Sequence, residues 1–211
     1  GHESGIGRAL DTLKDRPDAR VAIVGMGAGT TACYAKAGQA WRFYEINPEI
    51  PRLARKHFTY LADGEKRGAK IDTVLGDARL MLDREPDQQF DVLLLDAFSG
   101  DAIPMHLLTK EAFAIYRRHM KPDGIIVVHV TNSYLALAPV VEKLAADIGW
   151  KTTRIITEEE GDLDTTDYVM VTLNEPFLAA TPRDEPAAKE PKDIPLWTDR
   201  RHDLFQILML D

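Results

Sequence analysis

Short runs of apolar residues recur along much of the chain, and each ends in a glycine or a polar residue. The clearest runs cover residues 21–24, 43–45, 92–96 and 125–130, and a weaker run covers 71–75. Each run is almost continuously apolar, whereas a strand with one solvated face alternates apolar and polar residues. The pattern therefore predicts strands of a parallel sheet that is buried on both faces.

Stretches with helical spacing separate these runs. Residues 30–38 are small and alanine-rich, and residues 50–57 follow a proline that suits the start of a helix. Residues 109–119 begin with Thr109, a residue type that caps helix N-termini, and residues 135–148 carry apolar side chains at helical intervals. Strands that alternate with helices predict an α/β fold with a doubly wound sheet.

The pattern changes after the last of these helices. Residues 152–156 and 168–173 predict two further strands, and such a late hairpin fits a Rossmann-like sheet of the methyltransferase type, mostly parallel with a late antiparallel strand. Residues 176–195 concentrate prolines among charges and predict an exposed connector. We therefore expect one nucleotide-binding domain over residues 1–175, followed by this connector and by a tail, residues 196–211, that docks on the same domain.

The first strong strand runs into the closely spaced glycines Gly25, Gly27 and Gly29. Glycines let the backbone approach a ligand where a Cβ would clash, and N–H groups at the start of the next helix face that ligand. Tight turns between a strand and a helix use the same residues for packing. The loop alone therefore leaves a binding role and a packing role equally open.

Two acids follow this glycine loop. Glu45 ends the second strand about 20 residues after the loop begins, where a carboxylate accepts the hydroxyls of a ribose. Asp77, followed by Ala78, ends the third strand, where an acid accepts from the amino group of adenine. Each acid also suits the cap of the helix behind it. Both acids in this order behind the loop favour an adenosine site formed by Gly25–Gly29, Glu45, Asp77 and Ala78.

A nicotinamide dinucleotide is the competing ligand. Its loop has the spacing Gly-x-Gly-x-x-Gly, whereas Gly25, Gly27 and Gly29 form the tighter Gly-x-Gly-x-Gly. The Gly-Asp-Ala step at Asp77 also suits a single adenosine with a sulfonium arm. The sequence therefore favours S-adenosylmethionine or a close relative.

The strand at residues 92–96 ends in Asp96, and the loop behind it contains Asp101. The carboxyl ends of parallel strands are where α/β folds place their chemistry. A carboxylate there takes a proton from an incoming amine or orients it for in-line attack on the carbon beside sulfur. Asp96 and Asp101 are therefore candidate catalytic residues, and Asp96 is also a candidate cofactor-binding residue. Asp101 equally suits a turn that binds backbone amides.

The net charge, the cysteine count and the length of the apolar runs limit the classes of partner and the cellular location that we expect. The 211 residues have a net charge of −8, which repels phosphate backbones and anionic lipids, so no nucleic-acid partner is expected. Cys33 is the single cysteine, which excludes an intrachain disulfide and fits a reducing, cytoplasmic location. No apolar run approaches the roughly 18 residues that span a bilayer.

The remaining singled-out residues have structural interpretations. Cys33 lies in an alanine-rich stretch and is expected to be a small core residue. His106 and His119 show no metal-ligand spacing, so no metal site is predicted. His129 ends the fifth strand. A place in the lining of the pocket stays open for it, although a buried histidine with satisfied hydrogen bonds is favoured.

The glycine loop, Glu45, Asp77 and Asp96 fall in the order found in spermidine synthases, and the chain resembles that family over nearly its whole length. Residues 4–10, 96–109 and 196–199 are similar to motifs of a bacterial spermidine-synthase-like group that is often attached to a multi-span membrane region. The resemblance implies a fold of the S-adenosylmethionine-dependent methyltransferase superfamily. It also implies that Glu45 and Asp77 hold the nucleoside and that Asp96 is the acid of the catalytic loop. An attached membrane domain and a homo-oligomer are left open.

The chain departs from the family inside the glycine loop. Aminopropyltransferases carry an acid there that meets the ammonium of decarboxylated S-adenosylmethionine, whereas this chain has Ala28. Intact S-adenosylmethionine also carries a carboxylate, which a neighbouring acid would repel. Ala28 therefore favours the intact cofactor. The family's Asp-x-x-Asp pair becomes Asp96-x-x-Ser99, with Asp101 as an imperfect replacement, and its tyrosine–glutamine pair aligns with Glu3 and Ser4.

These observations predict an enzyme, a transferase that moves an alkyl group from S-adenosylmethionine to an unknown small-molecule acceptor, of which an amine is one candidate. Methyl transfer is the simplest form. Three alternatives stay open: aminopropyl transfer from decarboxylated S-adenosylmethionine to a polyamine, intramolecular cleavage of S-adenosylmethionine, and a non-catalytic nucleoside-binding regulatory module. The expected products are S-adenosylhomocysteine or methylthioadenosine.

Overall fold

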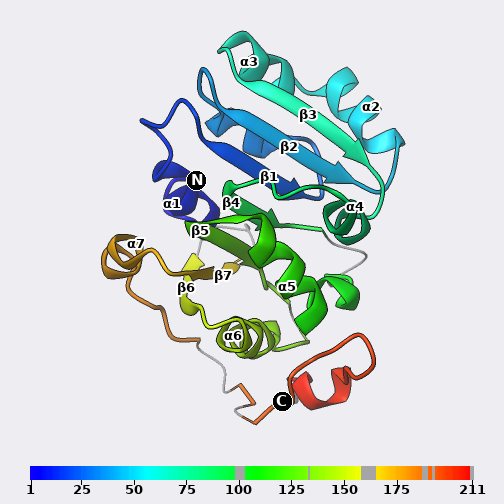
Figure 1. Cartoon of the computed structure of the whole chain (residues 1–211), viewed down its shortest axis with the longest axis vertical. Helices are drawn as coiled ribbons and strands as arrows, with labels where there is room; N and C mark the ends of the chain where they lie inside the picture. Colours follow the sequence, from blue (N-terminus) through cyan, green and yellow to red (C-terminus); the bar gives the residue numbers. More distant parts are fainter. Residues whose placement is uncertain (98–102, 133, 158–164, 187–189, 192, 210–211) are drawn as a thin grey trace.

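The computed structural model of the chain describes residues 1–97, 103–132, 134–157, 165–186, 190–191 and 193–209. Within these residues, seven strands form one sheet in the order β3-β2-β1-β4-β5-β7-β6 (Figure 1). The strands are β1 (Arg20–Val24), β2 (Ala40–Glu45), β3 (Lys70–Leu75), β4 (Phe90–Leu95), β5 (Met120–His129), β6 (Lys151–Thr157) and β7 (Thr166–Thr172).

The sheet has the mixed arrangement that the apolar runs predict. Strands β1 to β5 pair in parallel, whereas β7 pairs antiparallel with both β5 and β6. The prediction of a mostly parallel, doubly wound sheet with a late antiparallel strand is confirmed. Because β1 to β4 are parallel, their carboxyl ends meet at one edge of the sheet, and this edge carries the predicted site residues.

Helices connect the strands. The α-helices are α1 (Gly5–Asp11), α2 (Glu49–His57), α3 (Tyr60–Lys66), α4 (Ala78–Arg84), α5 (Lys110–His119), α6 (Leu137–Asp147) and α7 (Glu175–Ala180), with short 3₁₀ turns η1 (Thr30–Tyr34), η2 (Met105–Leu107) and η3 (Leu204–Ile207). The expected cap of α5 is present, because the Thr109 hydroxyl accepts the Ala112 N–H.

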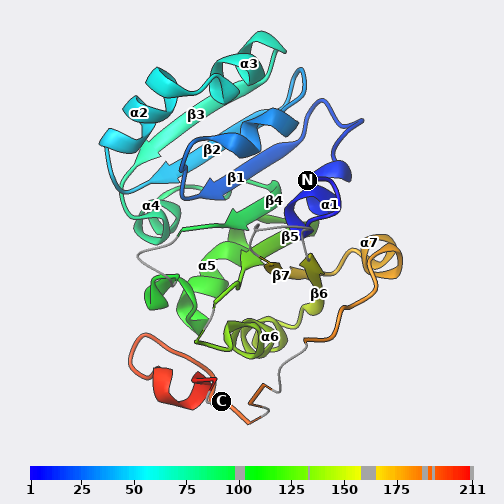
Figure 2. The same cartoon turned by 180° about the vertical axis from the view of Figure 1, so that it is seen from behind.

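The central strands are mainly apolar because helices cover both faces of the sheet, as the two opposite views show (Figures 1 and 2). Every residue of β4 is buried. Leu93 and Leu95 pack in one core cluster with α4, α5 and α6, whereas Val92 and Leu94 pack in a second cluster with α1, α2 and α3. Successive side chains of a strand point to opposite faces, so a continuous apolar run serves both cores.

The prediction of a helix over residues 30–38 is wrong beyond the first turn. The chain forms only the 3₁₀ turn η1, and the Arg67 guanidinium of the neighbouring segment donates to the carbonyls of Ala32 and Ala35. Those carbonyls are acceptors that a continuing helix would have used itself. Cys33 is exposed on this turn, so its expected place in the core is also wrong.

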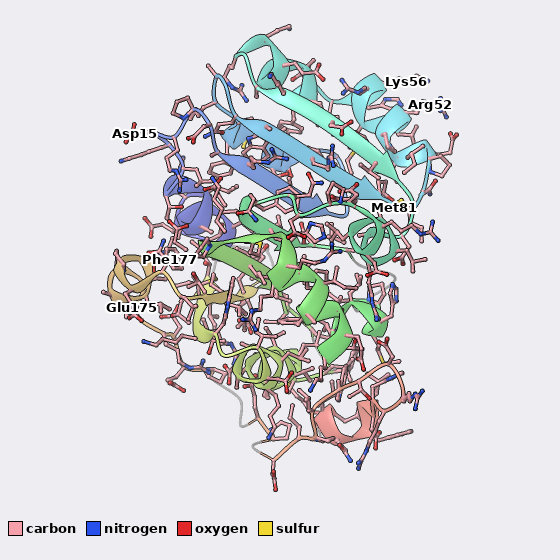
Figure 3. The ribbon with its side chains drawn as sticks, in the orientation of Figure 1. Asp15, Arg52, Lys56, Met81, Glu175 and Phe177 are labelled. Atoms are coloured by element: carbon pink, nitrogen blue, oxygen red, sulfur yellow. The ribbon has the colours of Figure 1, made fainter. Side chains whose placement is uncertain are left out.

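The range 176–195, expected to be an exposed connector, starts with helix α7. Asn174 caps this helix by accepting the Phe177 N–H at 3.0 Å, and Phe177 is buried, whereas Glu175 lies on the same helix with an exposed side chain (Figure 3). Farther along this range, Glu190 pairs with Arg154 of β6. The Arg154 side chain is 4% exposed and also pairs with Asp167. This ion-pair network ties the connector to the sheet.

The tail lies against α5 and α6. Trp197 is 1% exposed and packs in the first core cluster together with Ile207. The Lys110 N–H at the start of α5 donates to the Trp197 carbonyl at 2.8 Å. A short bridge also pairs Leu135 with Leu208.

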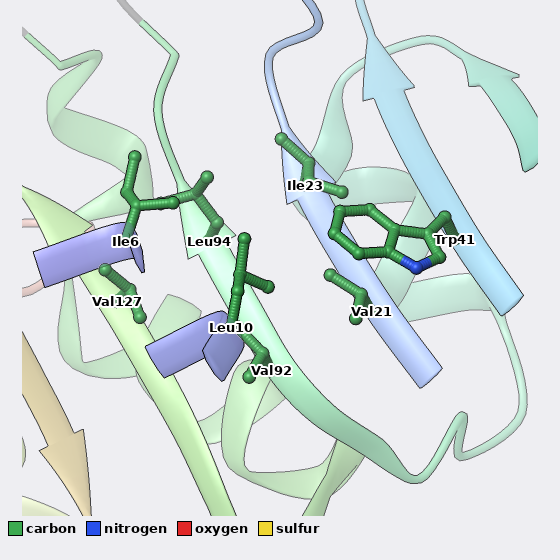
Figure 4. A pocket seen from close by; sticks show the side chains of 8 residues that line it. All are labelled: Ile6, Leu10, Val21, Ile23, Trp41, Val92, Leu94 and Val127. Carbon is green, nitrogen blue, oxygen red and sulfur yellow. The ribbon is translucent and has the colours of Figure 1, made fainter. Parts of the chain in front are cut away.

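Helix α1 leaves a small recess against the sheet (Figure 4). Its lining is entirely apolar and comprises Ile6, Leu10, Val21, Ile23, Trp41, Val92, Leu94 and Val127. With no polar group to orient a ligand, this recess is part of the core, and the candidate site lies at the carboxyl edge of the sheet instead. In the part of the chain that is described, no helix combines the length and apolarity needed to cross a membrane.

Candidate functional site

The glycine loop brings the end of β1 against the end of β4. Gly25 has φ +90°, and a Cβ placed on it would lie 2.6 Å from the Asp96 carbonyl oxygen. Gly27 has φ +52°, but a Cβ there would meet nothing within 4 Å. Gly25 is therefore a glycine for close packing, whereas Gly27 leaves open space above the loop. Gly29, at φ +77°, packs against Leu61 of α3.

Glu45 at the end of β2 holds the loop from the other side. Its side chain accepts the Met26 N–H on Oε2 at 3.0 Å and the Asn47 N–H on Oε1 at 2.9 Å. The residue is 8% exposed, so two backbone donors compensate its buried charge. Among the described residues, the Glu49 N–H at the start of α2 donates to Asn47 Oδ1 at 3.0 Å and no N–H of α2 donates to Glu45, so the alternative that Glu45 caps this helix is wrong. Each carboxylate oxygen retains a second lone pair for a ligand hydroxyl.

Asp77 follows β3 and caps α4. Its Oδ1 accepts the Leu80 N–H at 2.9 Å, and its Oδ2 lies 2.7 Å from Nε2 of His106. Ala78 is buried as the first residue of the helix. The Gly76 N–H donates to the Glu45 carbonyl at 2.9 Å, so this turn lies directly beside the end of β2. Asp77 therefore caps α4, as the sequence leaves open. Its carboxylate is still partly exposed at the carboxyl edge of the sheet.

Asp96 begins the segment behind β4. Its N–H donates to the Val24 carbonyl at 3.0 Å, and its Oδ1 lies 2.7 Å from Nδ1 of His129. The Tyr168 ring stacks on His129 at 4.4 Å. Burial first, and then the charge of Asp96, raise the pKa of Tyr168. Asp101, the other candidate catalytic residue, lies outside the described residues.

Exposed apolar side chains accompany the acids at this edge. Ile46 directly follows Glu45, Leu75 pairs with Glu45 across β2 and β3, and Leu80 lies in the first turn of α4. Their exposed fractions are 70%, 54% and 52%. Large apolar side chains that stay exposed beside held polar groups are typical of a ligand site, and here they suit a flat aromatic base.

Docking of the tail is expected from the sequence, but the partners that hold its Asp199 are not. The Arg79 guanidinium of α4 donates to both carboxylate oxygens of Asp199, and the Thr109 hydroxyl donates to Asp199 at 2.8 Å. Arg79 is the main cause of a lowered pKa for Asp199. Arg79 also donates to the His106 carbonyl. The motif at residues 196–199 is the only sequence signal for these contacts, and it does not indicate which residue pairs with its acid.

The structure thus brings the glycine loop, Glu45, Asp77 and Asp96 to one edge. Among the described residues, no group of histidine, cysteine and carboxylate side chains is placed to hold a metal ion. His106 and His129 are each paired with one of the site acids, and the sequence does not predict either pair. A helical or strand pattern carries no signal for these pairs, because the partners come from separate elements.

The strand order of the sheet and the site residues at its carboxyl edge define the class of protein, which has a Rossmann-like fold of the methyltransferase type. No protein-family model matches the chain. Over 121 residues, 54% of this chain, the sequence is 29% identical to a polyamine aminopropyltransferase of Vibrio vulnificus, 38% of which is covered. It is 32% identical over 130 residues to a probable polyamine aminopropyl transferase of Bifidobacterium longum, covering 58% of this chain and 26% of that protein.

A solved spermidine synthase from Thermotoga maritima shares the fold. Its TM-score is 0.63 at 15% identity, covering 94% of this chain and 67% of that one. The chain is therefore spermidine-synthase-like, in sequence through the named aminopropyltransferases and in fold through this structure. The matches span less than half the length of these two sequence relatives.

Proposed function

We propose that the carboxyl edge of the sheet binds the adenosine of a sulfonium donor and that the chain transfers an alkyl group from its sulfur to an amine. The observation that carries this proposal is the combination at Gly27 and Glu45. A Cβ on Gly27 would meet open space, while the Glu45 carboxylate beside it is held by two backbone N–H groups. A rigid carboxylate next to an open glycine loop suits a ribose.

The other groups fit the rest of an adenosine. Asp77 presents a carboxylate beside Glu45, where it suits an amino group of the base. Ile46 and Leu80 offer exposed apolar surface for the flat ring. The donor, when bound, supplies an electron-poor carbon on a positively charged sulfur.

The charges at the edge suit a cationic donor and an amine. Glu45, Asp77 and Asp96 are carboxylates there, and the nearby Arg79 is neutralised by Asp199. Asp96 is partly exposed, so one of its oxygens can accept the N–H of an amine while Oδ1 stays with His129. Orientation of the nucleophile and removal of its proton are the roles that this carboxylate suits.

Aminopropyl transfer is the form that the relatives favour, since both are named as aminopropyltransferases. Methyl transfer is a second candidate because Ala28 stands where that family carries an acid. Without this acid, the loop lacks a charge that would repel the carboxylate of intact S-adenosylmethionine.

The test is calorimetric titration with S-adenosylmethionine, its decarboxylated form and methylthioadenosine, followed by incubation of each donor with putrescine and mass spectrometry. Spermidine and methylthioadenosine from the decarboxylated donor would support aminopropyl transfer. A methylated amine and S-adenosylhomocysteine would support methyl transfer. Methylthioadenosine from S-adenosylmethionine alone indicates intramolecular cleavage.

The matched control is Asp96→Asn, which keeps an oxygen for His129 but removes the charge. We expect it to bind methylthioadenosine as the wild type does and to lose turnover. Failure of the wild-type chain to bind any of the three nucleosides would overturn the proposed function. Binding without product from either donor would instead favour a regulatory nucleoside-binding module.

A further inference from the structure

His129 ends β5 and has a partner at each ring nitrogen. Nδ1 lies 2.7 Å from Oδ1 of Asp96, and Nε2 lies 2.8 Å from Oγ1 of Thr131. The side chain is 18% exposed, against 31% for that of Asp96. The imidazole thus lies behind the carboxylate and links it to the interior of the protein.

The two partners of His129 favour a proton on Nδ1, because an ionised Asp96 carboxylate only accepts hydrogen bonds whereas the Thr131 hydroxyl can donate. The Asp167 N–H of β7 donates to Thr131 Oγ1 at 2.7 Å. The Thr131 hydroxyl can accept this bond and still donate its own proton to Nε2 of His129. A neutral imidazole that accepts at Nε2 carries its proton on Nδ1, and here that N–H points at Asp96.

The ring is also fixed by stacking. Tyr168 lies parallel to His129 within 21°, with ring centroids 4.4 Å apart, and is 5% exposed. Helix α1 packs closely against this tyrosine, since a Cβ on Gly5 would lie 2.5 Å from the Tyr168 Cβ. The Ser4-Gly5 motif, for which the proposed function gives no role, therefore contributes to the support of His129.

We propose that His129 is a positioning residue that donates from Nδ1 to Asp96 and so reserves the second carboxylate oxygen for the acceptor amine. The inference rests on the proposed function, because it concerns the same transfer. The amine lone pair forms a bond to the carbon on sulfur, and the electrons of the carbon–sulfur bond pass to sulfur. The proton of the amine passes to Oδ2 of Asp96.

The first test reads the tautomer and needs no turnover. Nitrogen NMR of the labelled chain is expected to show neutral His129 with its proton on Nδ1. Thr131→Val, which removes the hydroxyl at nearly constant volume, is expected to shift His129 toward the Nε2–H form. A neutral wild-type His129 protonated on Nε2 would overturn the positioning role.

The second test is kinetic and uses the donor that the wild type turns over. His129→Leu is expected to lower kcat about 100-fold, the order of loss for a misplaced catalytic group, with an unchanged KM for the donor. His129→Asn keeps an N–H near the position of Nδ1 and is expected to restore most of kcat. An unchanged kcat in His129→Leu, or no rescue by asparagine, would refute the inference.

The two proposals fail separately. A wild type that binds no nucleoside refutes the proposed function, whatever the tautomer of His129. An active wild type with the Nε2–H tautomer refutes the positioning role alone. If His129→Leu does not fold, as judged by circular dichroism, the Thr131→Val variant tests the same hydrogen bond, with an expected fall in kcat.

Discussion

Two glycines of one loop have different reasons to be glycine, and alanine at each position separates them. Gly25 packs against the Asp96 backbone, and Gly27 faces open space. Gly149 provides a matched control, because it also has a left-handed φ, +75°, and a Cβ added to it would meet no atom within 4 Å. It follows α6, at the edge of the sheet opposite the candidate site.

The magnitudes follow from these surroundings. A residue with a Cβ costs about 1–2 kcal/mol in the left-handed region, so Gly27→Ala and Gly149→Ala should each lower the free energy of unfolding by about that amount. Gly25→Ala adds a methyl group 2.6 Å from a backbone oxygen. Overpacking of this kind adds about 1–3 kcal/mol, for a total of about 2–5 kcal/mol. Against the typical domain stability of about 5–15 kcal/mol, Gly25→Ala is severe and the others are mild.

Urea unfolding measures the stabilities, and calorimetric titration with methylthioadenosine measures binding. We expect Gly27→Ala to weaken binding at least about tenfold, or ~1.4 kcal/mol, because its methyl group occupies the space proposed for the nucleoside. Gly149→Ala should bind as the wild type does at the same stability loss. If Gly27→Ala binds methylthioadenosine with wild-type affinity, the loop does not approach the nucleoside and the reasoning is refuted.

Three further substitutions test the site and the tail. Glu45→Gln places an amide N–H against one of two backbone donors, so we expect a stability loss of about 1–3 kcal/mol in urea and weaker methylthioadenosine binding by calorimetry. Trp197→Ala empties a fully buried site and should cost about 3–5 kcal/mol in urea unfolding. Asp199 has a pKa lowered by Arg79, so its carboxylate stabilises the fold above the unfolded value of about 3.9 and loses this effect as pH falls through the lower folded value. Asp199→Asn should therefore be less stable than the wild type at neutral pH, and the difference should shrink as the pH falls below that unfolded value.

Two control variants accompany the Glu45 and Trp197 predictions, and the pH dependence itself tests the Asp199 prediction. Glu49→Gln changes an exposed carboxylate paired with Arg52 and should alter neither stability nor binding beyond about 0.5 kcal/mol. Phe205→Ala, at a side chain 85% exposed, should be similarly neutral. A neutral Trp197→Ala would mean that the tail does not pack on the domain in solution. A stability difference for Asp199→Asn that persists undiminished at low pH would rule out the ion pair as its source.

The pattern of apolar residues was sufficient to predict the strands of the sheet, because a strand that is buried on both faces is apolar along nearly its whole length. β4 is apolar at every position but one since both of its faces are covered, and the runs at β1 and β5 have the same cause. The segment after Gly29 shows the limit of this reasoning. Its composition favours a helix, but Arg67, distant in sequence, binds the carbonyls that a longer helix would need.

The sequence by itself determined the order of the strands and the chain positions of the glycine loop, Glu45, Asp77 and Asp96. Those features depend on local periodicity and on the turns that follow each strand. Only the tertiary structure decided which groups bind these acids. His106 binds Asp77, His129 binds Asp96, and two backbone N–H groups bind Glu45. Apart from the Asn47 N–H, which lies two residues beyond Glu45, these partners come from different elements and meet only when the sheet is assembled, so no spacing along the chain encodes their contact.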